Sequence, residues 1–324
     1  MTAQNVTRRG FLAAAGGLVA SAALPSFAKD DPSVFPARGR FERLMLAFQR
    51  IEAGATAPFS LLHISDTHLT AANPDEPDGA DKQKSMVRRT RTFGGRQEEA
   101  LRDSLAWAKE NVDYVLHTGD LIDWQSEANF ALVKKYYGQN MFGAMGNHEF
   151  YTYLPGERRT HQEAFKTRSW PLLDAAYPVD PRFSARVING VNFICLDDAL
   201  GTVQPDQVER FHAEARKGLP MILCMHVPFY TPNIWRASKR FWRYGGKRFS
   251  AVPQALPELS WDSRSQQKDP TTRDFIAYLK GEPLVKGILA GHLHFAVQER
   301  FSPTAVQYVV GGNFMFHGQE VMFT

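Results

Sequence analysis

Two histidines one residue apart, His292 and His294, follow an apolar run at residues 285–290. An apolar run of this length, followed by a glycine, predicts a buried strand. Residues two apart on an extended chain point the same way, so both imidazoles should face one spot. A buried imidazole is costly unless it is hydrogen-bonded or bound to a metal. The pair alone is weak evidence for a metal site, because His-x-His strings also occur by chance on surfaces.

Polar side chains of the same kinds follow four other predicted strands. They are Asp66 and His68 after residues 59–65, Asp120 and Asp123 after residues 112–118, Asn147 and His148 after residues 140–146, and His226 at the end of residues 220–226. In open α/β sheets, ligands bind at the carboxyl ends of the strands. Oxygen and imidazole donors suit transition metals. Five strands that end in these residue types predict one shared metal site.

The elements that would position these residues alternate between strand and helix in the first half of the chain, and strands dominate the second half. This order indicates an α/β fold. We expect helices at residues 96–111, at 127–137, from near Pro205 and around 271–280, and further strands at residues 186–197, with a hairpin turn at Asn189 and Gly190, and within 294–301 and 305–312. Residues 70–95 and 229–270 fit no element, so we expect functional or partly ordered insertions there.

The motif series resembles that of the calcineurin-like metallophosphoesterases, which carry DxH, GDxxD, GNH(D/E), an isolated histidine after a strand, and GHxH. This sequence has DTH at 66, GDLID at 119, GNHE at 146, MHVP at 225 and GHLH at 291. The resemblance covers about residues 59–315, and the five-part series is highly specific. It implies two face-to-face mixed β-sheets flanked by helices, in four layers, with the site at the carboxyl edge of the sheets.

The resemblance implies a centre of two metal ions bridged by Asp120. The other ligands would be Asp66, His68 and His294 for the first ion and Asn147, His226 and His292 for the second. Two cations about 3.5–4 Å apart neutralise the anionic oxygens of a phosphate ester and deprotonate a shared water near neutral pH. We therefore expect a phosphoesterase that attacks with a metal-bridging hydroxide. The mixed oxygen and imidazole donors suit Mn, Fe or Zn.

The same matching gives His148 the role of the acid that protonates the leaving alkoxide. Asp123 would be its partner, fixing the tautomer of the imidazole and raising its pKa. Trp124 stands where the protein serine/threonine phosphatases carry an Arg-Gly pair, and Asp123 stands where purple acid phosphatases carry a tyrosine. Neither subclass is therefore expected. His63 and His117 lie inside predicted strands and are expected to be hydrogen-bonded core residues rather than ligands.

The substrate class stays open at this point. Residues 235–249 mix six basic with five aromatic residues, and we expect Arg236, Arg240, Trp242 and Arg243 to bind substrate. The insertion at 70–95 adds Lys82, Lys84, Arg88, Arg89 and Arg91. Such loops suit nucleotides, suit anionic lipid headgroups equally, or are simply solvated. A nuclease or a phospholipid-cleaving phosphodiesterase remains an alternative, as does a non-catalytic metal- or phosphate-binding module.

The first 28 residues have the layout of a cleavable export signal, with a charged start, a modest apolar stretch and a small-residue end at Ala28. Arg8 and Arg9, followed by Gly-Phe-Leu, resemble the twin-arginine signal. Residues 11–24 are too short for a membrane anchor. We therefore expect a periplasmic or otherwise exported protein that engages the twin-arginine machinery, with no membrane span. Residues 29–58 would lead into one domain at 59–324.

The composition is that of an ordinary soluble domain, with 44% hydrophobic and 22% charged residues. Loss of residues 1–28 removes two of the 38 basic residues and none of the 34 acidic ones, leaving a net charge of +2. Global charge therefore predicts no partner, and the oligomeric state stays open. Cys195 and Cys224 lie inside apolar runs, where reduced thiols are expected, although an oxidising compartment permits a disulfide.

Overall fold

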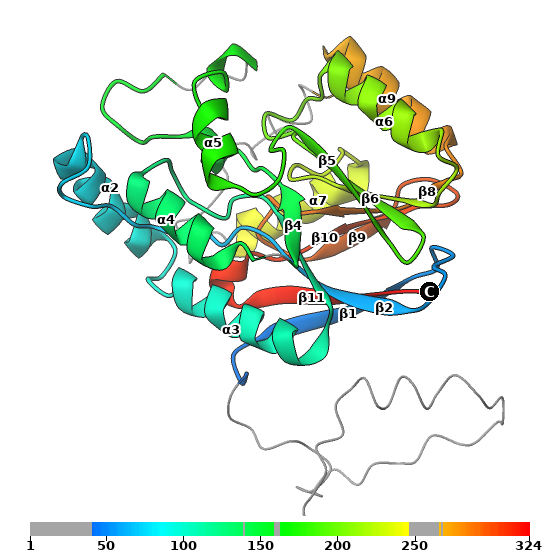
Figure 1. Ribbon diagram of the computed structural model, residues 1–324, viewed down its shortest axis with the longest axis horizontal. Coiled ribbons are helices and arrows are strands. Elements are labelled where there is room, and N and C mark those ends of the chain that lie inside the picture. The colour runs from blue at the N-terminus through cyan, green and yellow to red at the C-terminus, as the bar shows by residue number, and fades with distance from the viewer. Residues whose placement is uncertain (1–40, 139, 159–162, 246–265, 267) are drawn as a thin grey trace, which may run out of the picture.

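The computed structural model describes residues 41–138, 140–158, 163–245, 266 and 268–324 (Figure 1). The predicted export signal at residues 1–28 lies outside this part of the chain, as do the side chains of Trp242 and Arg243. No helix within the described residues is both long enough and apolar enough to cross a membrane.

The first sheet has five strands in the order β1-β11-β2-β3-β4. Their bounds are β1 (Met45–Ile51), β2 (Phe59–Ile64), β3 (Tyr114–Thr118), β4 (Met141–Ala144) and β11 (His317–Phe323). Strands β2, β3 and β4 are parallel, β11 runs antiparallel to β2, and β1 runs parallel to β11. The sheet is therefore mixed, and its three parallel strands end at one edge.

The second sheet has six strands in the order β5-β6-β7-β8-β10-β9. Their bounds are β5 (Phe183–Ile188), β6 (Val191–Leu196), β7 (Met221–Cys224), β8 (Val285–Ala290), β9 (Val297–Arg300) and β10 (Val306–Val309). Strands β6, β7, β8 and β10 are parallel, and β5 and β9 pair antiparallel at the two edges. The predicted hairpin joins β5 to β6, with positive φ angles at Asn189 and Gly190.

Three apolar layers hold the sheets and helices together. Leu61, Leu116, Phe193 and Leu289 belong to the cluster that joins the two sheets. On the outer face of the first sheet, a second cluster packs under α3 (Gln97–Asn111), α4 (Glu127–Tyr136) and α5 (Trp170–Ala176). A third cluster packs the second sheet under α6 (Pro205–Ala215), α7 (Pro232–Gly245) and α9 (Pro270–Gly281) (Figure 1). The four-layer arrangement implied by the resemblance is confirmed.

Local signals place the helix ends. Ser126 accepts a hydrogen bond from the backbone N–H of Asn129 and so caps α4, and Asp269 caps α9 through Thr272 in the same way. Proline occupies the first turn of α6 and α9, where its missing N–H costs nothing. Three short 3-10 helices complete the described elements: η2 (His148–Phe150), η3 (Glu163–Phe165) and η5 (Asn313–Met315).

Several elements were not expected from the sequence. The two segments predicted to fit no element both contain helices: α2 (Gly79–Thr92) lies in the first and α7 in the second. Helix α2 was not predicted because its sequence is polar almost throughout. Strand β11 was missed because Gln319 and Glu320 are polar but buried. Residues 45–51, assigned to the lead-in, form the edge strand β1.

Cys195 and Cys224 are free and buried on paired strands.

Candidate metal centre

The predicted ligands meet where the strands of both sheets end. Strands β2, β3 and β4 come from the first sheet, and β7 and β8 from the second. Their donor atoms form two groups, each with all its donors within 4.8 Å of one another: Asp66, His68 and His294 in the first, and Asp120, His226 and His292 in the second. All six residues are buried. The structure therefore brings together residues spread over more than two hundred positions of sequence, in the grouping that the resemblance implied.

Asp120 lies between the two groups. Its Oδ2 atom is 3.3 Å from Nε2 of His226 in its own group and 3.7 Å from Nε2 of His68 in the other. In the first group, Nε2 of His294 lies 3.3 Å from Oδ1 of Asp66. One carboxylate oxygen of Asp120 therefore lies close to residues of both groups.

Hydrogen bonds to the far side of the rings aim the imidazoles inward. Nδ1 of His226 lies 2.7 Å from the backbone oxygen of Thr118, and Nδ1 of His68 lies 3.0 Å from Oδ1 of Asp123. A ring that donates through Nδ1 keeps the Nε2 lone pair for a metal. Burial lowers the pKa of His68 to about 4, which keeps that ring neutral. The rings of His226 and His68 therefore present Nε2 to the neighbouring ligand residues.

The centre attracts positive charge. Burial disfavours a charged His226, yet the Asp120 and Asp66 carboxylates raise the pKa of its imidazole to about 10. One buried oxygen, Oδ1 of Asn147, accepts no hydrogen bond from any described residue. An unpaired buried oxygen costs free energy unless another partner is present. These donors fit a pair of cations held by oxygen and imidazole ligands.

The backbone at the centre is strained. Five of the seven predicted ligands have left-handed φ angles: Asp66, His68, Asp120, His292 and His294, with values from 52° to 69°. Asp and His occupy this region more readily than most residues, but each such residue still costs of order 1–3 kcal/mol. The left-handed turns place the ligand side chains at the strand ends. Strain of this kind persists where the surrounding packing enforces it.

Two glycines of the motifs let the loops approach one another. A Cβ atom at Gly146 would lie 2.2 Å from Oδ1 of Asp120, and one at Gly291 would lie 1.8 Å from Oγ of Ser65. Both distances are far below a possible contact. The glycines of GNHE and GHLH are therefore required because no side chain fits beside the neighbouring ligand loop.

Glu149 ties two of the ligand loops together. Its carboxylate accepts the backbone N–H groups of Asp120, Leu121 and Gly146 at 2.8 to 2.9 Å, and the hydroxyl of Tyr177 at 3.2 Å. Burial raises the pKa of Glu149 to about 7. In the sequence, Glu149 is only the last residue of the GNHE motif, and nothing there indicates that it links two ligand loops by hydrogen bonds.

His148 lies at the rim of the centre, with its side chain 14% exposed. Its Nδ1 atom is 2.8 Å from Oδ1 of Asp123 and 3.0 Å from the backbone oxygen of the same residue, and its Nε2 atom is 3.9 Å from Oδ2 of Asp120. Burial lowers the pKa of this imidazole, but Asp120 and Asp123 outweigh burial and raise it. The predicted pairing of His148 with Asp123 is present, and the free side of the ring faces the metal ligands.

Comparison with known families decides the class. The family model for calcineurin-like phosphoesterases matches residues 59–296, more than half of the chain. The protein is a calcineurin-like phosphoesterase. The match spans all five motifs and every predicted ligand. Enzymes of this class are metal-dependent hydrolases of phosphate esters, and the two groups of donors described above agree with a dimetal centre.

Similar solved structures include a dimetal phosphatase from Danio rerio, with 13% identity and a TM-score of 0.44 over 79% of this chain and 88% of that one. PhoD has 14% identity and a TM-score of 0.45 over 81% of this chain and 58% of its own. A 5'-nucleotidase from Candida albicans SC5314 has 13% identity and a TM-score of 0.36 over 83% of this chain and 46% of its own. Likenesses this distant carry no conclusion about the substrate. No curated protein matches the chain.

The two histidines expected in the core of this phosphoesterase are buried and hydrogen-bonded. His63 pairs through Nε2 with Thr118 and through Nδ1 with Gln319, and Nε2 of His117 pairs with the hydroxyl of Thr67. Burial lowers the pKa of both rings to about 3. Within the part of the chain that the structure describes, neither belongs to a group of possible metal ligands.

The residues expected to bind substrate lie on α7 rather than in a loop. Arg236 and Arg240 are exposed, and Arg236 donates to Oδ1 of Asn233. The opposite side of α7 packs on the second sheet, where Ile234 is buried and Phe241 stacks on Phe295 with ring centroids 4.7 Å apart. The helix therefore presents a basic side to solvent. Whether these residues contact substrate stays a prediction.

Helix α2 contributes site residues whose role was missed. The Arg89 guanidinium forms a two-pronged ion pair with Asp123, and Phe93 stacks on His68 with ring centroids 4.1 Å apart and an interplanar angle of 12°. In the sequence, Arg89 stood out only as one of five basic residues suited to an anion. In the structure the charge of Arg89 is paired with Asp123 of the protein itself, and the sequence alone does not indicate this contact.

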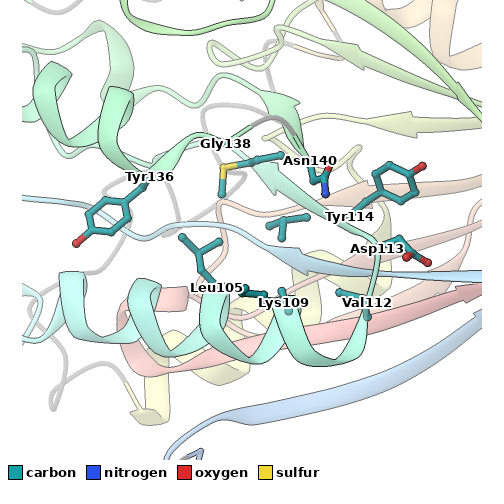
Figure 2. Close-up of a pocket in the computed structure, with 11 residues that line it drawn as sticks. Leu105, Lys109, Val112, Asp113, Tyr114, Tyr136, Gly138 and Asn140 are labelled. Carbon is teal, nitrogen blue, oxygen red and sulfur yellow. The ribbon is translucent and has the colours of Figure 1, made fainter. Parts of the chain in front are cut away.

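A pocket of about 430 Å³ lies away from this centre (Figure 2). It is lined by the end of α3, including Lys109, and by residues at the starts of β3 and β4, such as Tyr114 and Met141. Ligands of α/β sheets bind at the carboxyl ends of strands, and this pocket opens at the amino ends. It contains none of the predicted site residues.

Proposed function

We propose that this phosphoesterase cleaves its ester at a two-ion centre and that His148 donates the proton taken up by the leaving oxygen. The observation that carries the proposal is the position of His148. Its Nδ1 atom is held by Asp123, which leaves Nε2 directed toward Asp120 at the rim of the centre. A group in that place reaches a leaving group without competing for the metal ligands.

The chain's own residues would divide the work. When bound, the two cations would activate a water and neutralise the phosphoryl oxygens. The seven predicted ligand residues would hold the ions, with Asp120 between the two groups. The Asp123 carboxylate favours the imidazolium form of His148, so that a proton is present at Nε2 when the leaving oxygen develops charge. Glu149 keeps the loop of Asp120 in register with the loop of Asn147 and His148.

A leaving-group series tests this role of His148. His148→Ala should keep its metals but lose roughly 10²- to 10⁴-fold in kcat on alkyl esters, the usual worth of general acid catalysis. Nitrophenyl esters should lose far less, because their leaving group departs without a proton. An equal loss on every ester would instead mean that His148 only stabilises charge on the phosphoryl group.

We further propose that the enzyme works in the periplasm on an ester with additional negative charge. The twin-arginine-like signal supports the location, and the exposed arginines of α7 support the substrate class. Cell fractionation of the full chain beside an Arg8→Lys, Arg9→Lys variant checks the location: the variant should remain in the cytoplasm. A panel of nucleotide, lipid and small monoesters and diesters, tested with metal-loaded protein, checks the substrate. A preference for phosphate esters of small neutral alcohols would contradict the proposal that the substrate carries additional negative charge.

A further inference from the structure

Arg89 of α2 binds the buried carboxylate of Asp123 with two hydrogen bonds. Its Nε atom donates to Oδ2 at 2.5 Å, and its terminal nitrogen donates to Oδ1 at 2.8 Å. The Asp123 side chain is fully buried, and the Arg89 side chain is 17% exposed. A fork of this kind fixes the plane of the carboxylate as well as its charge.

The two carboxylate oxygens of Asp123 contact different sets of side chains. Oδ1 lies 2.8 Å from Nδ1 of His148 and 3.0 Å from Nδ1 of His68, so it serves both the proposed proton donor and a metal ligand. The one hydrogen bond to Oδ2 from any described residue comes from Arg89. Without Arg89, Oδ2 would lose this partner, and the orientation of the carboxylate would depend on the contacts of Oδ1 with the two rings alone.

Two aromatic rings contact Arg89. Its guanidinium carbon lies 4.5 Å from the ring centroid of Tyr153 and 5.0 Å from that of Phe93. Phe93 in turn stacks on His68, and the hydroxyl of Tyr153 lies 3.3 Å from Nδ1 of His148. Cation–π contacts of this kind stabilise a partly desolvated guanidinium. The two rings that contact Arg89 thus also contact the two histidines that its carboxylate partner orients.

Helix α2 is anchored to the rest of the fold. The Ser85 hydroxyl donates to the backbone oxygen of Tyr153, and the buried Lys82 pairs with Glu76. Glu76 also accepts the N–H of Glu127 at the start of α4. These contacts fix the position of the helix that carries Arg89. A long side chain can orient another group only if its backbone is held in place.

We propose that Arg89 is a positioning residue for the proton donor. It holds Asp123 so that Oδ1 faces Nδ1 of His148, which keeps the imidazole directed at the leaving oxygen. This inference rests on the proposed role of His148. It assigns Arg89 to the protein's own carboxylate rather than to the substrate, although basic residues in this segment suit an anionic ligand equally well by sequence.

The leaving-group series separates the two roles of Arg89. Arg89→Ala should lose roughly 10- to 100-fold in kcat on alkyl esters, part of the full worth of general acid catalysis, and little on nitrophenyl esters. KM and metal content should be nearly unchanged. Guanidinium ion added in solution should restore part of the lost rate, because it fills the space that the side chain left. Arg89→Lys should recover less than the wild type, since an ammonium cannot form the fork.

Arg96 offers a matched control. Its guanidinium forms a fork of similar geometry with Glu99, at 2.8 and 2.7 Å, and lies over the ring of Phe316, and none of its contacts among the described residues is with a site residue. Arg96→Ala should leave the leaving-group dependence unchanged. The Arg89→Ala, His148→Ala double variant should be no slower on alkyl esters than His148→Ala alone, because both changes remove one function.

Four results would overturn the inference. A rise in KM on all esters, with the leaving-group dependence intact, would make Arg89 a substrate-binding residue. Loss of metal from Arg89→Ala would mean that it only supports His68. If His148→Ala shows the leaving-group effect and Arg89→Ala does not, only the positioning role of Arg89 is contradicted. If neither variant shows the leaving-group effect, the proton-donor role of His148 is contradicted as well. Should Arg89→Ala not fold, Arg89→Lys decides by the same series.

Discussion

The Oδ2 atom of Asp120, which follows a strand of the first sheet, lies 3.3 Å from Nε2 of His226, more than one hundred positions away after a strand of the second sheet. The same oxygen lies 3.7 Å from Nε2 of His68, which follows another strand of the first sheet. One carboxylate atom thus faces the ligand groups delivered by both sheets. A site built this way depends on the packing of the sheets against each other as much as on the ligands themselves.

Asp120→Asn should lower metal content and activity together. Asparagine tolerates the left-handed φ of 56° at this position, so the fold should survive, but the amide carries no negative charge to share between two cations. We expect fewer than two ions per chain by elemental analysis and a loss of hydrolysis in parallel. Full metal content in an inactive variant would show that Asp120 acts in the chemistry rather than in binding.

Glu149→Gln should destabilise the fold and weaken metal binding. The carboxylate accepts three closely spaced backbone N–H groups of the two ligand loops, and an amide would turn a donor toward at least one of them. An unsatisfied buried donor costs about 1–3 kcal/mol. Thermal unfolding of the metal-free protein measures this cost without interference from the ions. An unchanged Tm would mean that the loops are held by other contacts.

Gly291→Ala should be much more harmful than an ordinary glycine substitution. The added Cβ would lie 1.8 Å from Oγ of Ser65 and 2.8 Å from Oδ2 of Asp66, so β8 and β2 would have to separate. Overpacking of this kind costs about 1–3 kcal/mol, and here it also moves ligands. Gly138→Ala is the control, because nothing lies within 4 Å of the new atom. Equal Tm values for the two variants would contradict the account.

Removing the exposed charges of α7 should weaken binding of an anionic substrate. The double variant Arg236→Ser, Arg240→Ser should raise KM for the best ester of the panel, and the effect should shrink as salt screens the charges. Hydrolysis of a small nitrophenyl ester should be unaffected. Arg273→Ser, an exposed arginine on α9, is the matched control. If the double variant behaves like this control at low salt, α7 is only part of the scaffold.

The ligands were predictable because their residue types recur at the ends of predicted strands, and the motif series assigns each to an ion. The turns that present them were not, because the left-handed φ angles of Asp66 and His292 arise from tertiary packing. Strand β11 escaped prediction since the buried Gln319 pairs with His63, a partner 256 residues away. Arg89 looked like a charge for an anion, because nothing in the sequence places α2 beside Asp123.

Metal content is the measurement that tests the central claim most directly. The full chain, purified after export, should contain close to two transition-metal ions by elemental analysis. Chelation should abolish hydrolysis of phosphate esters, and adding back Mn, Fe or Zn should restore it. Protein that holds no metal and hydrolyses esters at full rate after chelation would contradict the account of the site, because every ligand contact described here would then lack a purpose.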